Sequence, residues 1–252
     1  MYFAVSDVHG FYSLLIQSLK EKGWEENNPE HIIIFCGDIL DRGDEPDKMF
    51  DFLSKLYKEK RCIFIRGNHE DLYLDCRKEV ENGISSPHHR HNGTLDSVKK
   101  LIETGKDEDF SQMILHHSVD YFELGNYIFV HGWIPADVLD DFPIYFARHR
   151  YYGFNKNWRN ANKKDWEAAR WTNGMEAASQ GIIEEGKTIV CGHWHTGWGH
   201  YYWHNQGLNE YDNLDVFREK GIIAIDACTA YSKKINVLVF DDKGNEIIQK
   251  TK

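Results

Sequence analysis

Short apolar runs alternate with longer amphipathic segments over the first part of the chain. The runs at residues 2–6, 32–36 and 62–66 have the length of buried strands, and apolar side chains at helical spacing predict helices near 11–22 and 45–59 between them. A strand–helix–strand order of this kind is typical of a parallel sheet, because the crossover helix returns the chain to the same edge. The pattern therefore predicts an α/β fold.

The rest of the chain has a less regular pattern. Residues 82–93 are polar and rich in turn formers, which predicts a loop before two helices near 94–104 and 107–117. Residues 140–181 are crowded with aromatic and basic side chains, and we interpret this segment as an insertion with helical pieces between two core strands. The strands expected after it are near 221–226, 235–240 and 245–249. A turn at 241–244 predicts a hairpin of the last two, so an antiparallel C-terminal part is expected.

Composition narrows the class of protein. The chain has 252 residues with no repeat or Pro-rich linker, so we expect a single domain over 1–252. A formal net charge of -10 argues against stable nucleic-acid binding, which needs a surplus of Lys and Arg. No apolar stretch approaches the roughly 20 residues that span a bilayer, and no secretory leader precedes the first apolar run. We expect a cytoplasmic protein with neither a membrane nor nucleic acid as a partner.

Polar motifs follow five of the apolar runs directly. Each motif comes at the carboxyl end of a predicted strand, where the loops of an α/β sheet converge on a ligand. The motifs are Asp7-Val8-His9-Gly10, Gly37-Asp38-Ile39-Leu40-Asp41-Arg42-Gly43, Gly67-Asn68-His69-Glu70, His131-Gly132 and Gly192-His193-Trp194-His195. One such motif is readily explained as a structural turn, whereas five together indicate a shared site.

The residue types in these motifs favour divalent metal ions. Carboxylate, imidazole and amide oxygen suit Mn²⁺ first, with Fe or Zn²⁺ as alternatives, and the five cysteines include no close pair of the kind that a structural zinc site uses. The candidate ligands are Asp7, His9, Asp38, Asn68, His131, His193 and His195. They exceed what one ion can take while leaving a position for water, so two ions are expected. Two ions about 3.5–4 Å apart activate water for displacement at phosphorus, and Asp38 is the candidate bridge.

The motifs resemble those of a known enzyme family. Residues 37–43 and 67–70 are similar to the GDxxDRG and GNHE motifs of the PPP-type serine/threonine phosphatases, which belong to the calcineurin-like metallophosphoesterase superfamily. The other three motifs follow in the family order. The resemblance implies a four-layer α/β/β/α sandwich of two mixed sheets flanked by helices.

The resemblance also implies roles for single residues. One ion would take Asp7, His9 and Asp38, and the other Asp38, Asn68, His131 and His193. His69 would protonate the leaving group, Asp41 would orient that imidazole, and Arg42 would bind two phosphate oxygens. Arg170 stands roughly where these enzymes have a second phosphate-binding arginine. The expected function is hydrolysis of phosphate monoesters, with phosphoserine and phosphothreonine in proteins as the first candidates, by direct attack of a metal-bridging hydroxide.

Departures from the family pattern keep other functions open. Ser6 replaces the first glycine of the GDxHG motif, and His195 completes a GHxH motif, either as a further ligand of the first ion or as a hydrogen-bonding neighbour. Gly-His-Trp also resembles symmetrical diadenosine tetraphosphate hydrolases, although these usually have Ala where this chain has Asp41. The alternative is therefore hydrolysis of a nucleotide pyrophosphate or phosphodiester bond. A third reading, a non-catalytic scaffold, is disfavoured by the complete ligand set.

Three features of the sequence remain outside these roles. Glu70 is explained equally well as a carboxylate at a helix start, where it favours the helix dipole. The aromatic residues of 194–203 would either stack a nucleobase or, the interpretation that we favour, pack beside the fifth motif. The histidines of 88–91 are interpreted as part of a solvated loop without a carboxylate partner rather than as a metal site.

Overall fold

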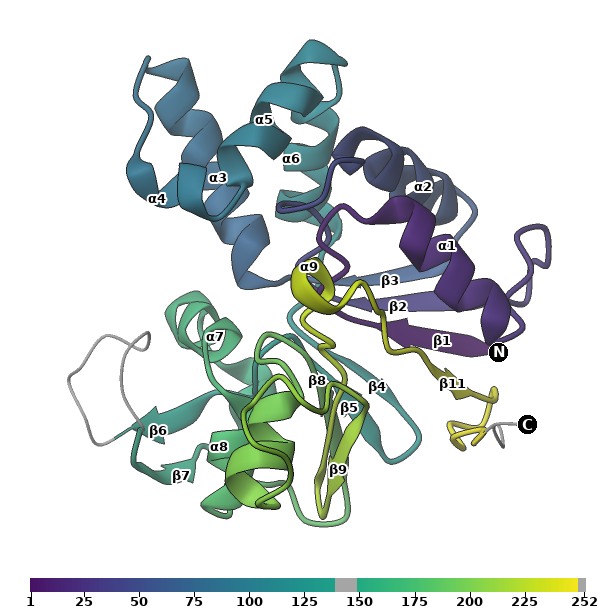
Figure 1. Ribbon diagram of the computed structural model, residues 1–252, viewed down its shortest axis with the longest axis vertical. Helices are drawn as coiled ribbons and strands as arrows, with labels where there is room; N and C mark the ends of the chain where they lie inside the picture. Colours follow the sequence, from purple (N-terminus) through teal and green to yellow (C-terminus); the bar gives the residue numbers. More distant parts are fainter. Residues whose placement is uncertain (139–148, 249–252) are drawn as a thin grey trace.

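Two β-sheets face each other in the computed structural model, and helices cover the outer face of each sheet (Figure 1). The structure describes residues 1–138 and 149–248. The layer order is helices, sheet, sheet, helices, which confirms the predicted four-layer arrangement.

The first sheet is built mainly from the N-terminal part of the chain. Its strands, in spatial order, are β11 (Leu238–Phe240), β1 (Tyr2–Val5), β2 (Ile32–Cys36) and β3 (Cys62–Ile65). β1, β2 and β3 are parallel, as the strand–helix alternation predicted, and β11 is antiparallel to β1. The crossover helices are α1 (Tyr12–Glu21) and α2 (Pro46–Lys58).

The second sheet is mixed. In spatial order it contains β4 (Phe122–Leu124), β5 (Tyr127–Phe129), β8 (Thr188–Cys191), β10 (Ile222–Ala224) and β9 (Phe217–Glu219). β10 runs antiparallel to β9 but parallel to β8, so the expectation of an antiparallel C-terminal part is only partly confirmed. The long connection between β8 and β10, which contains a π-helical turn at Gly199–Trp203, returns the chain to the same edge and makes this parallel pairing possible.

Four helices follow β3 and lie beside the first sheet in Figure 1. They are α3 (Asn68–Glu81), α4 (Pro87–His91), α5 (Thr94–Glu103) and α6 (Asp107–His117). The short α4 corrects the expectation of a loop over 82–93: the Ser86 hydroxyl caps it and Pro87 begins it, both of which favour a helix start. No helix in the described ranges is both long and apolar enough to cross a membrane.

The described part of the aromatic-rich insertion forms an outer layer on the second sheet. It contains β7 (Tyr151–Phe154), paired with β6 (Ala136–Val138), and the helices α7 (Lys163–Arg170) and α8 (Gly174–Ser179). Residues 140–148 of this prediction lie outside the described residues. Trp158 and Trp166 are buried in the hydrophobic cluster on this face of the sheet, so aromatic side chains of the insertion serve packing.

Side chains of opposite strand faces fill separate hydrophobic layers. Ile33 packs toward the helices, whereas Ile34, its neighbour in β2, packs between the two sheets together with Phe129 and Val190. Successive residues of a strand point to opposite faces, so a strand covered on both sides must be apolar at every position. The run Ile32–Cys36 meets this requirement, as predicted.

The C-terminal strands are shorter than expected. β11 includes only the end of the predicted strand 235–240, and a short helix, α9 (Thr229–Ser232), precedes it. Of the predicted strand 245–249, Glu246 forms an isolated bridge with Phe240, and residue 249 lies outside the described residues. The predicted hairpin turn is present in a reduced form.

Replacing Phe129 by alanine tests the layer between the sheets. Phe129 is fully buried, and its ring centroid lies 5.2 Å from that of Phe240. We expect the free energy of unfolding to fall by about 3–5 kcal/mol, because transfer energy is lost and a cavity remains. Urea unfolding measures the change. The control is Leu208→Ala, at a residue that is 91% exposed. A fall of its free energy of unfolding by more than about 0.5 kcal/mol would contradict this assignment of the core.

Candidate metal centre

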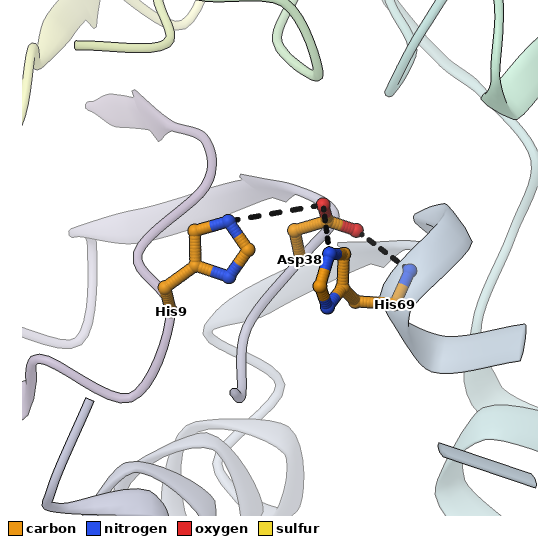
Figure 2. A group of neighbouring side chains, drawn as sticks. All are labelled: His9, Asp38 and His69. Atoms are coloured by element: carbon orange, nitrogen blue, oxygen red, sulfur yellow. Dashed lines mark hydrogen bonds and ion pairs between the residues drawn. The ribbon is translucent and has the colours of Figure 1, made fainter. Parts of the chain in front are cut away.

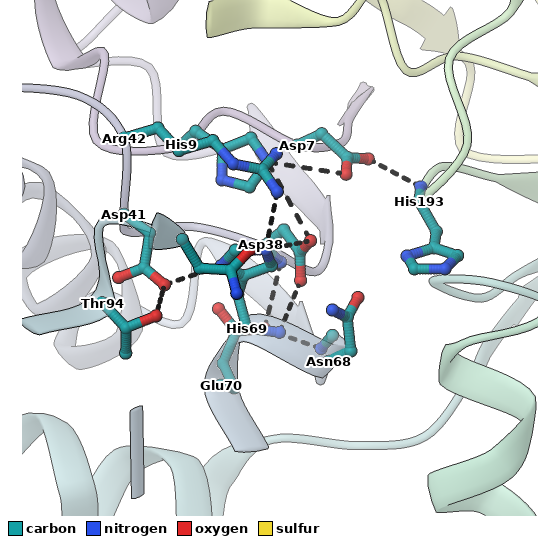
Figure 3. Close-up of polar contacts among 12 residues, drawn as sticks. Asp7, His9, Asp38, Asp41, Arg42, Asn68, His69, Glu70, Thr94 and His193 are labelled. Atoms are coloured by element: carbon teal, nitrogen blue, oxygen red, sulfur yellow. Dashed lines mark hydrogen bonds and ion pairs between the residues drawn. The ribbon is translucent and has the colours of Figure 1, made fainter. Parts of the chain in front are cut away.

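The predicted ligands converge where strands of the two sheets end, and Figure 3 shows most of them around one point. They are Asp7 and His9 after β1, Asp38 after β2, Asn68 at the start of α3, His131 after β5 and His193 after β8. The structure therefore brings residues from both sheets together, as expected for strand-end motifs in an open α/β fold.

The backbone of these turns adopts a conformation that is rare for residues with a side chain. Asp7, His9, Asp38, Asp41, Arg42 and His193 have φ between 48° and 76°. Such left-handed residues are costly and cluster at functional sites. Glycines permit the close approach of the turns: a Cβ atom on Gly67 would overlap Asp38 Oδ1, and one on Gly192 would overlap the Ser6 hydroxyl. Steric exclusion of a side chain thus explains why glycine occupies these motif positions.

Asp38 lies at the centre of the cluster. Its Oδ2 faces His9 Nε2 at 4.0 Å and His69 Nε2 at 3.9 Å (Figure 2), and its Oδ1 is 3.3 Å from His131 Nε2. It belongs to both groups of metal-ligand atoms found in the described residues, one with His9 and His69 and the other with His131 and His193. Separations of 3–4 Å are those of ligands that share an ion at about 2.1 Å, and a bridging role for Asp38 stays a prediction.

The second group contains acceptor atoms that face one another. His131 Nδ1 lies 2.8 Å from the Cys36 carbonyl, which can only accept, so Nδ1 carries the proton and Nε2 presents a lone pair. That Nε2 is 2.8 Å from Asn68 Oδ1 and 3.3 Å from Asp38 Oδ1. A divalent cation between these atoms would offset the repulsion among the carboxylate, the amide oxygen and the imidazole lone pair. The residues present therefore fit a divalent cation.

The first group is oriented by hydrogen bonds from its surroundings. His9 Nδ1 donates to the Leu40 carbonyl at 3.0 Å, which leaves Nε2 facing Asp7 Oδ1 at 3.9 Å. The other oxygen of Asp7 accepts from the Ser6 hydroxyl at 2.5 Å and from the His193 backbone N–H at 2.9 Å. Ser6, which departs from the family motif, thus orients a predicted ligand.

Burial sets the protonation of these side chains. It lowers the pKa of His9, aided by the charge of Arg42, and the pKa of His193, aided by His131, so both imidazoles are kept neutral. Burial and the nearby Asp7 raise the pKa of Asp38. Neutral imidazole is the form that binds metal, and a cation would offset the cost of a buried carboxylate.

His69 is held from one side by Asp41 and approached from the other by Arg42. His69 Nδ1 lies 2.6 Å from Asp41 Oδ2, which also accepts from the Thr94 hydroxyl at 2.7 Å, and burial raises the pKa of Asp41 to about 6. Arg42 Nη1 is 2.6 Å from His9 Nε2, and Nη2 is 3.0 Å from His69 Nε2. Burial and Arg42 lower the pKa of His69. The arrangement matches the predicted orienting role of Asp41.

Glu70 has a more specific role than a charge at a helix start. Its carboxylate accepts from the backbone N–H groups of Asp38 at 3.0 Å, Ile39 at 2.9 Å and Gly67 at 2.6 Å. Burial raises its pKa, and these hydrogen bonds oppose that shift. Glu70 therefore joins the turn after β2 to the start of α3.

Sequence reasoning missed three side chains near the centre. Thr94 and Ser97 contact Asp41 from α5, and nothing in the sequence marks two hydroxyls on a helix as partners of a motif more than 50 residues away. Asp226 follows β10 and is 6% exposed, and burial and the charge of Asp7 raise its pKa. An acidic residue at a strand end was the signal used for the other motifs, and it would have found Asp226 too.

His195 lies apart from both groups of ligand atoms. Its ring stacks on Tyr211 with centroids 5.0 Å apart, and its Nε2 is 3.9 Å from Glu210. A metal-ligand role for His195 stays a prediction.

Arg170 is paired with carboxylates in the structure, and its phosphate-binding role stays a prediction. The side chain is buried at the end of α7, where Nε donates to Asp71 at 2.8 Å and Nη1 to Asp120 at 2.7 Å. Asp71 also pairs with Arg66. A guanidinium committed to two carboxylates is part of a buried ion-pair network that holds α7 against α3, and the loose alignment with the phosphatases could not reveal these partners.

Two further clusters singled out in the sequence are the aromatic residues of 194–203 and the histidines of 88–91. Trp194, Trp198 and Trp203 pack against the hydrophobic cluster of the second sheet, as we favoured. His89 is buried with Nε2 3.6 Å from Glu79, so the expectation of a solvated histidine loop without a carboxylate partner is wrong for this residue.

Comparisons with known proteins agree with this geometry. The sequence model of the family described as calcineurin-like phosphoesterase matches residues 2–224. The asymmetrical bis(5'-nucleosyl)-tetraphosphatase PrpE of Bacillus velezensis is 25% identical over 183 residues, 67% of this chain and 72% of that protein. Serine/threonine-protein phosphatase 1 of Salmonella typhimurium is 33% identical over 82 residues, 32% of this chain and 35% of that protein.

A solved structure shows the same fold at low sequence identity. The cold-active protein-tyrosine phosphatase of a Shewanella species superposes with a TM-score of 0.57 and 16% identity, over 96% of this chain and 75% of that one. With the family match over most of the chain and with two sheets meeting at one centre, the chain belongs to the calcineurin-like phosphoesterase family and is a hydrolase of phosphate esters.

Proposed function

We propose that the chain hydrolyses a phosphoanhydride bond of a dinucleoside polyphosphate at a centre of two divalent metal ions. The observation that carries the centre is the position of Asp38, whose two oxygens face two different groups of ligand atoms. The substrate class is supported by the tetraphosphatase relative, whose match extends over two thirds of the chain. This was the alternative reading of the sequence, although the relative is named asymmetrical rather than symmetrical.

The proposed ligands combine members of the two groups with Asp7 and Asn68, which lie beside them, and leave out His69. Asp7, His9 and Asp38 would hold one ion, and Asp38, Asn68, His131 and His193 the other. Mn²⁺ suits this set of oxygen and nitrogen donors, as do Fe and Zn²⁺. Ions bound there would supply a nucleophilic water and positive charge for the phosphoryl oxygens.

The remaining groups would bind the substrate and move a proton. Arg42 is exposed at the edge of the centre, and its two Nη atoms lie between His9 and His69, where they would bind two oxygens of the attacked phosphate. An anionic phosphate there would offset the effect of Arg42 on His69 and favour its protonated form. His69 Nε2 would then give its proton to the leaving oxygen while Asp41 holds Nδ1.

Protein phosphatase activity is the second candidate. The Asp41-Arg42 pair matches the motif of the PPP-type enzymes, and a protein phosphatase relative aligns with 82 residues of the chain. A serine alkoxide is a poorer leaving group than a phosphate. An acid that is oriented by a buried carboxylate, as His69 is, would benefit a phosphomonoesterase more.

A substrate panel separates the two candidates. Protein loaded with Mn²⁺ is assayed with diadenosine tetraphosphate, a phosphoserine peptide and p-nitrophenyl phosphate. We expect kcat/KM for the dinucleotide to exceed that for the peptide by at least about 100-fold, and chromatography of the products as ATP plus AMP, or as two ADP, gives the bond that is cut. Faster cleavage of the peptide would establish the second candidate instead.

The change Asp38→Asn tests the bridge. Loss of the charge common to both groups removes a ligand from each ion, so we expect the bound Mn²⁺ to fall from two equivalents to fewer than one. Equilibrium dialysis with metal analysis measures this. The control is Asp242→Asn in an exposed turn, which should retain two equivalents. Two tightly bound equivalents in Asp38→Asn would exclude a bridging role.

The change His69→Asn separates a proton donor from a metal ligand. His69 Nε2 lies in the same group of atoms as His9 and Asp38, so both roles fit its position. If His69 is the acid, the metal content of the variant stays at two equivalents, and turnover of an alkyl phosphate falls about 10²–10⁴-fold. Turnover of p-nitrophenyl phosphate falls much less, because its leaving group needs no proton. Equal losses for both esters together with a lost metal equivalent would identify it as a ligand. Exposed His116→Asn is the control.

A further inference from the structure

We propose that the cavity between α3 and α7 binds one nucleoside of the substrate, with its phosphates directed toward the metal centre. This inference rests on the proposed function, because it names where the nucleoside of such a substrate is held. The ligand class is a purine or pyrimidine nucleoside that carries a 5'-phosphate chain.

The cavity has the size of a small ligand site. Its volume is about 320 Å³, at the lower end of the range for pockets that take small molecules. One wall is formed by α3 and by Leu115 of α6, and the other by Lys163 and Glu167 of α7 and by Trp171 just after it. In Figure 1, α7 lies below the lower end of α3.

Residues of the wall connect the cavity directly to the centre. The Trp171 carbonyl lies 3.1 Å from His193 Nε2, and the Trp171 ring meets the His193 ring edge-on with centroids 5.6 Å apart. Arg66, which also lines the cavity, comes two residues before Asn68 in the chain. Trp171 therefore contacts both the cavity and a residue of the centre, so a nucleoside held in the cavity would lie near a phosphate bound at the centre.

The lining, which also includes the carboxylates of Asp71 and Asp75 and the ammonium group of Lys78, offers groups that a nucleoside can contact. Trp171 and Leu115 offer aromatic and aliphatic faces for a base, and stacking on an aromatic side chain is worth about 1–3 kcal/mol per base. The Glu167 carboxylate offers an acceptor for ribose hydroxyls. Lys163, which pairs with Glu167 at 3.6 Å, adds a positive charge on the same wall.

A second aromatic surface lies beyond the fifth motif but is less suited to this role. Tyr231 is 67% exposed and packs on Tyr211 with centroids 5.1 Å apart, while Tyr211 stacks in turn on His195. Two contacts already cover the faces of Tyr211, and an exposed ring encloses a base less completely than a cavity does. Tyr231 nevertheless defines the competing location that the experiment must separate.

Filling the cavity from either wall tests the proposal. The changes are Leu115→Trp and Glu167→Trp; Leu115 is 51% exposed and Glu167 is partly exposed, so both variants should fold. We expect each to lower the ratio of kcat/KM for diadenosine tetraphosphate to kcat/KM for p-nitrophenyl phosphate about tenfold, mainly through KM. The control is Leu208→Trp, at a side chain that is 91% exposed, where the ratio should stay unchanged.

Equilibrium binding of AMP, measured by calorimetry, separates this proposal from the proposed function. We expect the Kd for AMP to rise at least about fivefold in both filled variants, whether or not the wild-type protein cleaves the dinucleotide. Cleavage of the dinucleotide by wild-type protein with an unchanged ratio and an unchanged Kd in both variants would overturn the cavity and leave the proposed function standing. A loss of AMP binding in Tyr231→Ala but in neither filled variant would place the nucleoside on the tyrosine surface and also overturn the proposal.

Discussion

The arrangement of the centre depends on one buried carboxylate that is not itself a predicted ligand. Glu70 accepts from three backbone N–H groups, two in the turn after β2 and one in the turn after β3. Those turns carry Asp38, Asn68 and His69. A carboxylate with three such donors is rigidly placed, and hydrogen bonds to a charged acceptor are stronger than neutral ones. Glu70 thus fixes the relative position of three side chains with different chemical tasks.

A second constraint is electrostatic. Asp7, Asp38 and Asp226 are nearly or fully buried within one region, where burial raises the pKa of Asp38 and Asp226 and lowers the pKa of His9 and His193. Such an array is unfavourable by itself, since like charges repel and neutral imidazoles offer only lone pairs. The left-handed turns show that backbone energy is also stored here. Divalent cations would relieve the electrostatic cost.

The sequence predicts those features of the centre that depend on neighbouring residues, and it misses those that depend on contacts between residues far apart in the chain. The ligands come directly after strands, so a local signal predicted both the strand and the side chain at its end. Arg170 is different, because its partners Asp71 and Asp120 are 99 and 50 residues away, and only the packing of α7 on α3 brings them together. The same holds for Thr94 beside Asp41. The direction of β10 depends on the path of a long connection, which no local pattern specifies.

The bond between Asp7 and the backbone of His193 links residues 186 positions apart. Asp7, a predicted ligand, is therefore positioned by the turn that carries His193, another predicted ligand, and that turn is among the later parts of the chain to leave the ribosome. A nascent chain that ends before this turn contains the complete first sheet except β11, and most of the proposed ligands, but lacks the donor that orients Asp7. The arrangement of the centre is thus complete only when the second sheet has joined the first.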